Sequence, residues 1–197
     1  MKHEKHIIYD FETLSQESNG VVTCCALLLF EDSRFNPSND PYTFEELADS
    51  CKVIKLNVED QVKNYGRKIS QSTLDWWKEQ GEEAQKWITP SDDDQKISKL
   101  YDWFWESIPL GVKNFYTRGN TFDPIFLQSL MADTDRPMPY DWWQIRDTRS
   151  YIEGLAWGSD LMNDYIPPGC ESFIKHNPKH DVVLDVMRMQ TIARAIG

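Results

Sequence analysis

The sequence predicts an α/β fold in which helices flank a mixed β-sheet. Two strand-like apolar runs, at residues 6–12 and 21–30, lie on either side of the turn-rich segment 15–20, and this pattern is typical of a hairpin. After residue 70 the spacing of apolar residues becomes helical, and helical segments then alternate with a strand-like run at 113–119. This order of elements along the chain, with strands first and then alternating helices and strands, indicates a sheet covered by helices.

The remaining elements follow from local patterns. Segment 51–57 predicts a third strand, and the Pro- and Asn-rich segment 31–47 predicts a loop with room for a short helical turn. Ser91 stands three residues before Asp94, which is the spacing of a capping box at a helix start, and Pro124 is tolerated in a first helical turn. The predicted helices span 70–80, 81–88, 91–108, 121–131, 147–158 and 178–197.

Composition limits the classes of function. A chain of 197 residues that is 40% hydrophobic, with eight tryptophans, predicts a single domain over 1–197 with a large aromatic core. The net charge of −11 excludes a generally basic nucleic-acid coat, because an acidic surface repels phosphates. A polyanionic substrate would therefore need metal ions or a local basic patch.

The cysteines and apolar runs indicate a cytoplasmic protein, in the host cytoplasm if the protein is viral. None of the four cysteines forms a CxxC pair, and four scattered cysteines fit a reducing compartment better than a disulfide scaffold. The N-terminal apolar segment is too short and too acidic for a signal peptide. The longest apolar run, 21–30, is far shorter than a membrane span.

The stretch IIYDFETL raises a question of charge. Asp10 and Glu12 lie two residues apart in a predicted strand, so both carboxylates point to the same side, opposite Tyr9 and Phe11. Two neighbouring carboxylates repel each other and are costly to bury without compensation. Either carboxylate alone would more often be an exposed strand-end residue.

Two other segments carry residues that could bind compensating cations together with this acidic pair. Asp123 follows a strand-like run and enters a helix, and His180 and Asp185 lie in the HDVVLD segment near the C-terminus. Oxygen ligands that converge from distant segments are what a pair of hard divalent cations needs, and two such cations would offset the repulsion within the acidic pair.

The spacing near the C-terminus leaves one choice open. His180 and Asp185 are about 140° apart around a helix, so they serve one site only if His180 lies in the loop that leads into the helix. Asp181 and Asp185, four residues apart, do share a helical face. Geometry alone therefore does not select His180.

The segments DFET, NTFD and HDVVLD together resemble the three motifs of DEDDh-family 3′-5′ exonucleases. Segments 72–94 and 144–153 are similar to the T4-type phage exonuclease A and to related bacterial exoribonucleases, and the resemblance runs from about residue 7 to 195. Each motif is weak alone, but the set in this order is specific.

The resemblance implies an RNase H-like mixed sheet and two Mg²⁺ or Mn²⁺ ions that act in hydrolysis. It implies cleavage of single-stranded nucleic acid from the 3′ end to nucleoside 5′-monophosphates, with DNA slightly favoured over RNA. It also gives each residue a role. Asp10 would bridge both metals, Glu12 and Asp185 would hold the metal that carries the attacking water, and Asp123 would hold the second metal. His180 would be the general base.

Several side chains are candidates for substrate contact. By the resemblance, Thr13 and Leu14 lie against the terminal nucleotide, although Leu14 could equally be core. Phe122 could stack on a base or pack in the core. Of the neighbouring Trp76 and Trp77, at most one can pack centrally on a helix, and core packing is the safer expectation for either.

Three arginines, Arg118, Arg146 and Arg149, could form a local basic patch for phosphates. Arg146 and Arg149 are the favoured substrate contacts, but Arg146 could instead pair structurally with Asp147.

Two other classes compete with an enzyme. An acidic DNA mimic fits the net charge, but its carboxylates should be spread over an exposed surface, whereas the key ones here are framed by apolar residues. A non-catalytic nucleic-acid-binding protein would not need the complete set of five residues. A homodimer is compatible with the aromatic richness, but so is a large core.

Overall fold

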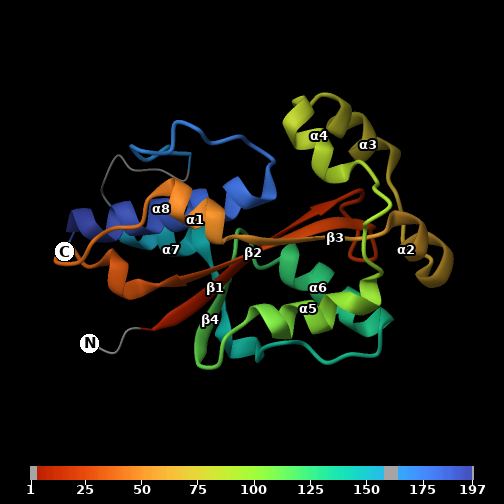
Figure 1. Ribbon diagram of the computed structural model, residues 1–197, viewed down its shortest axis with the longest axis horizontal. Coiled ribbons are helices and arrows are strands. Elements are labelled where there is room, and N and C mark those ends of the chain that lie inside the picture. The colour runs from red at the N-terminus through yellow and green to blue at the C-terminus, as the bar shows by residue number, and fades with distance from the viewer. Residues whose placement is uncertain (1–3, 158–163, 197) are drawn as a thin grey trace.

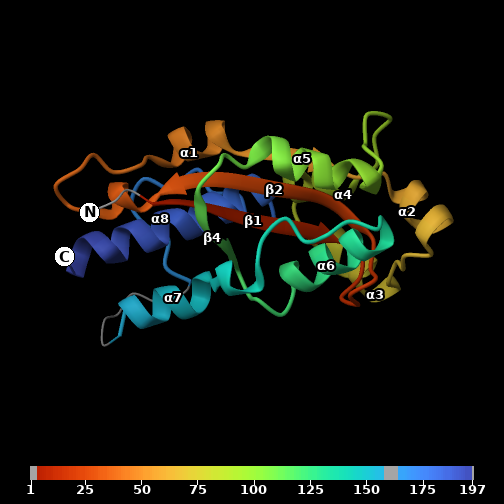
Figure 2. The same cartoon turned by 90° about the horizontal axis from the view of Figure 1, so that it is seen from below.

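The computed structural model describes residues 4–157 and 164–196. Its sheet has the order β3-β2-β1-β4-β5. The strands are β1 (Lys5–Thr13), β2 (Val22–Glu31), β3 (Lys52–Lys55), β4 (Val112–Thr117) and β5 (Ile145–Asp147). Antiparallel pairs join β1 to β2 and β2 to β3, while β1–β4 and β4–β5 are parallel. The sheet is therefore mixed, as predicted, and β1 and β2 run lengthwise through the middle of the molecule (Figure 2).

Helices cover both faces of this sheet. The α-helices are α1 (Phe44–Ser50), α2 (Val58–Tyr65), α3 (Gln71–Lys78), α4 (Glu82–Ile88), α5 (Leu100–Ser107), α6 (Asp123–Asp133), α7 (Thr148–Leu155) and α8 (Pro178–Ile196). Short 3-10 helices occupy Asp32–Phe35, Ile97–Lys99 and Trp142–Gln144. In Figure 1, α1, α7 and α8 gather at one end, and α3 and α4 stand apart from them beyond the sheet.

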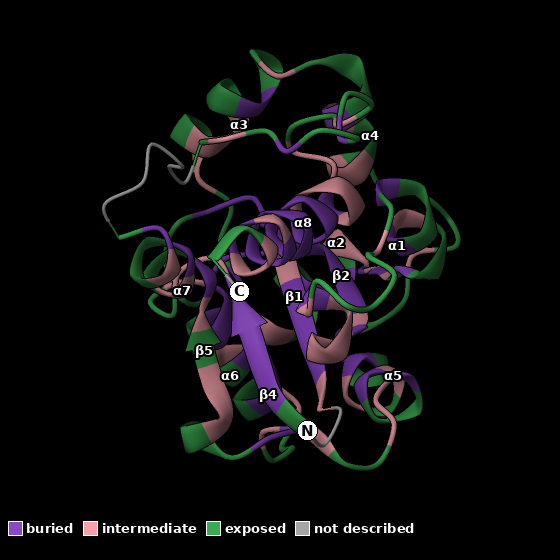
Figure 3. Cartoon of the chain, turned by 90° about the vertical axis from the view of Figure 1, so that its left-hand side faces the viewer, coloured by how far each residue is buried: buried purple, intermediate pink, exposed green. Residues whose placement is uncertain are grey.

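The alternation along β1 separates two cores. Ile8 packs in one core with residues of α1, α7 and α8, whereas Ile7 and Tyr9 pack in the other with residues of α5 and α6. Because side chains alternate along a strand, Asp10 and Glu12 lie on the same face as Ile8, toward α8. Strands β1, β2 and β4 and helix α8 are the most continuously buried elements (Figure 3).

One predicted helix begins later than its sequence pattern suggests. Ser91 and Asp94 do form a capping-type hydrogen bond, from Ser91 N–H to Asp94 Oδ2 at 2.9 Å, but it closes a turn. The next residue, Gln95, then bridges Leu56 like a strand residue, so helix α5 starts only at Leu100, after a 3-10 turn. The predicted start at Ser91 is therefore wrong, although the apolar face around Phe104 is buried as expected.

Three elements lie outside the predictions. Helix α1, capped by Thr43, falls mainly in the segment predicted to be a loop. Helix α2 begins at an Asn57 cap and ends at Gly66, whose φ of 65° is the left-handed conformation that glycine tolerates best. Strand β5 is only three residues long, with Arg146 exposed.

All four cysteines are buried free thiols. Within residues 4–157 and 164–196, none of the helices combines the length and the apolar character that a membrane crossing needs.

Candidate active site

The acidic pair of β1 lies where this strand departs from regular pairing. Asp10 and Glu12 stand opposite Ala26 and Cys24 of β2, and the register shifts directly after Glu12. Such irregularities re-aim side chains and are frequent next to active sites. Glu12 is only 7% exposed, and Asp10 is partly buried. Within the described residues, no group donates a hydrogen bond to either carboxylate.

Asp123 joins this pair from the start of α6. It is 2% exposed, and its Oδ1 accepts a hydrogen bond from the N–H of Phe11 at 3.1 Å. This bond ties the start of α6 to the residue that separates Asp10 from Glu12. Strand β4 and the turn after it deliver Asp123 to this position, as the sequence predicted.

Helix α8 contributes two carboxylates, which differ in their partners. Asp185 is 1% exposed, and its Oδ1 accepts hydrogen bonds from Arg118 at 2.5 Å and from Arg188 at 3.1 Å. Its Oδ2 accepts one from Thr148 at 2.5 Å. Asp181 instead has a carboxylate oxygen that lies with one oxygen each of Asp10 and Glu12, all within 4.8 Å of one another.

The pKa values record the crowding of negative charge. Burial, followed by the charge of Asp123, raises the pKa of Asp10 well above its usual value. Burial and then the charge of Asp181 do the same to the pKa of Glu12. Burial also raises the pKa values of Asp123 and Asp181 to about 7 each. The cluster must therefore share protons or hold cations at neutral pH.

The donor set fits a hard divalent cation. All the converging groups are carboxylates, which Mg²⁺ and Mn²⁺ prefer over nitrogen or sulfur. Glu12 lines the cavity described next, and none of the described residues donates a hydrogen bond to its carboxylate, which is the state expected of a metal ligand.

A cavity of about 410 Å³ opens beside Glu12. Its wall includes Thr13 and Phe122, two of the predicted substrate contacts. Trp76 and Trp77 complete the aromatic wall, and Trp77 is 2% exposed with its indole N–H bonded to the carbonyl of Thr13 at 2.9 Å. Trp76 remains 42% exposed, so one tryptophan packs centrally and the other does not, as expected.

Sequence reasoning missed the polar side of this cavity. Gln16, Ser72 and Thr73 line it together with the aromatic residues. The signal was present, because Ser72 and Thr73 precede Trp76 and Trp77 by one helical turn and so share their faces. Leu14, in contrast, is 5% exposed and packs with Trp77 in a small apolar core. The structure thus places Leu14 behind the wall of the cavity.

Comparison with known proteins identifies the family. The chain matches the family described as the 3′-5′ exoribonuclease Rv2179c-like domain over residues 5–193. The chain belongs to this family. It is also 30% identical, over 206 residues, to the exodeoxyribonuclease of Enterobacteria phage T4, with 95% of this chain and 88% of that protein covered. The protein is accordingly a DEDDh-type 3′-5′ exonuclease.

Solved structures confirm the RNase H-like fold. A zinc-bound complex of E. coli exonuclease I with single-stranded DNA superposes with a TM-score of 0.60 at 12% identity, over 99% of this chain and 40% of that one. Product-bound exonuclease I gives a TM-score of 0.57 at 10% identity, over 97% and 42%. The chain therefore spans about two fifths of the length of exonuclease I.

His180 of this exonuclease does not lie among the carboxylates described above. Helix α8 begins at Pro178, so His180 is in the first helical turn rather than in a preceding loop. Its ring packs edge-on against Phe44, with centroids 5.1 Å apart, and its Nδ1 accepts a hydrogen bond from the N–H of Ile174 at 3.0 Å. Burial and the nearby Lys179 lower the pKa of His180.

The predicted arginines occupy three different environments. Arg149 is exposed, and its charge lowers the pKa of Asp123, so it lies close to the site. Arg146 donates to the carbonyls of Trp143 and Ile145, both at 2.7 Å. Asp147, its alternative partner, caps α7 by accepting from backbone N–H groups. Arg118 is bound to Asp185, as described above.

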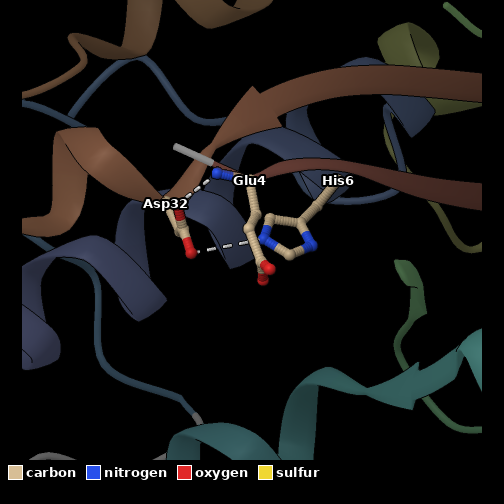
Figure 4. A group of neighbouring side chains, drawn as sticks. All are labelled: Glu4, His6 and Asp32. Carbon is tan, nitrogen blue, oxygen red and sulfur yellow. Dashed lines mark hydrogen bonds and ion pairs between the residues drawn. The ribbon is translucent and has the colours of Figure 1, made fainter. Parts of the chain in front are cut away.

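A second group of metal-ligand types lies at the opposite end of β1 (Figure 4). Glu4, His6 and Asp32 approach one another there, but their charges have other partners. His6 Nε2 is 3.6 Å from Asp32 Oδ2, and Lys113 pairs with Glu4 at 2.6 Å. Burial lowers the pKa of His6, and the Glu4 N–H donates a hydrogen bond to Asp32 Oδ1 at 3.0 Å, so these contacts and the Lys113–Glu4 ion pair account for the group without a cation.

Proposed function

We propose that this exonuclease uses two divalent metal ions, Mg²⁺ or Mn²⁺, to remove nucleoside 5′-monophosphates from the 3′ end of single-stranded nucleic acid, with DNA preferred over RNA. The observation that carries this proposal is the convergence of Asp10, Glu12 and Asp123 beside an aromatic cavity. The proposed ligand set is the predicted one, in which Asp185 of α8 completes these three residues. The chain acts as one domain.

Bound cations would lower the pKa of an attacking water and stabilise the negative charge that develops on the leaving 3′ oxygen. The residues of the chain supply position and proton transfer. The terminal base would enter the cavity and stack on Trp76 or Phe122, which places the last phosphodiester beside Glu12. Thr13 and Arg149 would hold the terminal sugar and phosphate.

His180 is the proposed base that takes the proton of the attacking water. Its lowered pKa keeps the ring neutral near pH 7, as a base requires. The hydrogen bond from Ile174 occupies Nδ1, so in the neutral ring the proton lies on Nε2. The ring must therefore leave Ile174 before it can accept a proton from water.

The preference for DNA rests on the phage relative. Its printed name is exodeoxyribonuclease, and the likeness extends over 95% of this chain. The second candidate is a 3′-5′ exoribonuclease that trims RNA, and the description of the matching family favours it. The buried position of Glu12 and Asp123 argues against an acidic DNA mimic, which needs exposed carboxylates.

The test uses a DNA and an RNA oligonucleotide of one sequence, each labelled at the 5′ end, with Mg²⁺ or Mn²⁺. We expect stepwise shortening from the 3′ end, faster on DNA, and its loss with a chelator or with Asp10→Ala. Asp92→Asn, an exposed carboxylate on a distant turn, is the control and should retain activity. Faster shortening of RNA would support the second candidate, and a chelator-resistant ladder would contradict the metal mechanism.

A further inference from the structure

A second cavity lies between helix α6 and the segment that leads into strand β5. Its volume is about 550 Å³, which is large enough for one nucleobase. We propose that this cavity binds a base of the substrate strand upstream of the bond that is cut, and that Trp142 is its stacking surface. The inference rests on the proposed function, since this strand is the substrate of the same reaction.

The first argument is the continuity of this cavity with the active site. Phe122 lines the cavity beside Glu12, whereas Pro124 lines the second cavity, so the two neighbours of Asp123 belong to different cavities. A strand whose last phosphodiester lies beside Asp123 therefore has one cavity for its terminal base and another for an upstream base. This continuity favours the substrate strand as the occupant over a second copy of the chain.

The second argument is the aromatic character of the lining. Trp142 is 79% exposed, so most of its indole ring is open to solvent. Tyr140 is 8% exposed and contributes a fixed part of the wall, because its hydroxyl is hydrogen-bonded to that of the buried Tyr9. Exposed aromatic rings bind single strands without regard to sequence, since every base offers a face for stacking.

The third argument is the polar part of the lining, which suits a base and not a phosphate. Asn120 and Gln128 are exposed amides that can both donate to and accept from a base edge. Asp141 also lines the cavity, and its carboxylate accepts the N–H of Gln144 as a cap. The charge of Asp141 repels a phosphate group, whereas a carboxylate can accept a hydrogen bond from the amino group of a base.

The fourth argument is the charge of the molecule. A chain with a net charge of −11 gains little from phosphate contacts, so stacking must supply much of the affinity for a strand. Arg149 is the exception. Its Nη1 lies 4.0 Å from the position that a Cβ atom of Gly119 would occupy, in the turn that leads to Asp123. It is therefore placed to pair with a phosphate between the two cavities.

Strands with and without upstream bases test this inference. One is a ten-nucleotide DNA strand, and the other has the same length and the same 3′ nucleotide but abasic sugars at every upstream position. Fluorescence anisotropy of the labelled strands in Ca²⁺ gives the Kd of each. We expect Trp142→Ala to raise the Kd of the base-bearing strand about tenfold, the loss of one stacked base, and to change the Kd of the abasic strand by less than about twofold.

Two further variants act as controls. Trp142→Phe keeps an aromatic face and should bind the base-bearing strand within about threefold of the parent protein. Trp105→Ala removes a tryptophan of α5 that is 48% exposed and lines neither cavity, so it should change neither Kd. Circular dichroism of each variant establishes that the fold is retained.

The outcomes separate this inference from the proposed function. If the parent protein shortens DNA in Mg²⁺ but Trp142→Ala binds the base-bearing strand as tightly as the parent, the inference is overturned and the proposed function stands. An equal loss of affinity for both strands would also overturn it. So would a dimer that dissociates in Trp142→Ala without a change in strand affinity, seen by sedimentation equilibrium, because the cavity would then hold a second copy. Failure of the parent to shorten any strand would contradict the proposed function itself.

Discussion

At the scale of single residues, the acidic cluster couples folding to pH. Asp123 and Asp181 have pKa values of about 7 in the folded, metal-free protein, against 3.8 in the ordinary state. The folded protein therefore binds more protons than the unfolded chain between those two values. Stability from these groups must fall as the pH rises from about 4 to 7, and it is present below that window.

We predict that the chelated protein loses less stability between pH 5.5 and 8 when Asp181 is replaced by Asn. Thermal unfolding of Asp181→Asn beside the parent protein isolates this residue from the histidines, which titrate in the same range. Saturating Mg²⁺ should raise the Tm of the parent at pH 8 by about 5–10 °C, since a ligand at a hundred times its Kd adds about 2.7 kcal/mol. Parallel pH profiles for the two proteins would contradict the prediction.

The two neighbouring tryptophans should separate binding from stability. Trp76→Ala removes a partly exposed stacking surface, so we expect KM to rise about tenfold or more, since each stacked base contributes about 1–3 kcal/mol. Trp77→Ala removes a fully buried ring and should cost about 3–5 kcal/mol of stability. Steady-state kinetics and urea unfolding of both variants check this, and equal effects on KM and stability would contradict it.

Residue positions could be predicted where chain geometry fixes them. The period of two along a strand placed Asp10 and Glu12 on one face without any tertiary information. The sequence could not decide whether Asp181 or His180 lies beside the carboxylates, because the answer depends on the residue at which α8 begins. The helix starts at Pro178, which brings Asp181 to the carboxylates and sends His180 toward Phe44.

At the scale of elements, the hairpin between β1 and β2 positions the cavity wall. A Cβ atom at Gly20 would lie 2.7 Å from Ser15 Cβ and 2.9 Å from the carbonyl oxygen of Glu17. The turn that follows Thr13 therefore closes only around a glycine.

We predict that Gly20→Ala lowers stability by about 1–3 kcal/mol through this overlap and raises KM by displacing the turn next to the cavity. The matched control is Gly154→Ala in α7, where nothing lies within 4 Å of the added Cβ. That change should be neutral or stabilising by up to about 1 kcal/mol. Chemical denaturation of both variants provides the measurement, and a neutral Gly20→Ala would contradict this account of the turn.

Elements with long periodic patterns were predictable, and short or polar ones were not. Strands β1, β2 and β4 and helix α8 carry continuous apolar patterns, so their existence follows from sequence alone. Strand β5 has three residues and depends on pairing with β4, a contact that no local pattern announces. The start of α5 was displaced because Gln95 pairs with Leu56, which is again a tertiary contact.

At the scale of the whole molecule, the net charge of −11 limits how nucleic acid is bound. Among the described residues, Arg149 lies close to the site, while Arg118 and Arg188 are paired with Asp185, so we expect few phosphate contacts. Because binding of a single strand releases counterions, the logarithm of the association constant falls with the logarithm of the salt concentration, by about 0.7 per phosphate contact. We predict a total slope shallower than about −2. Fluorescence anisotropy of a labelled oligonucleotide, in Ca²⁺ and at several salt concentrations, measures this slope. A slope near −5 would contradict the prediction and indicate a basic surface that contacts many phosphates.

The most direct test of the central claim is a crystal structure of the protein soaked in Mn²⁺, with an anomalous difference map. We predict a strong peak bounded by Asp10, Glu12 and Asp185, with a second position between Asp10 and Asp123 when a nucleotide is bound. A map with Mn²⁺ at Glu4, His6 and Asp32 instead, or with no peak at the β1 carboxylates, would contradict the account of this site.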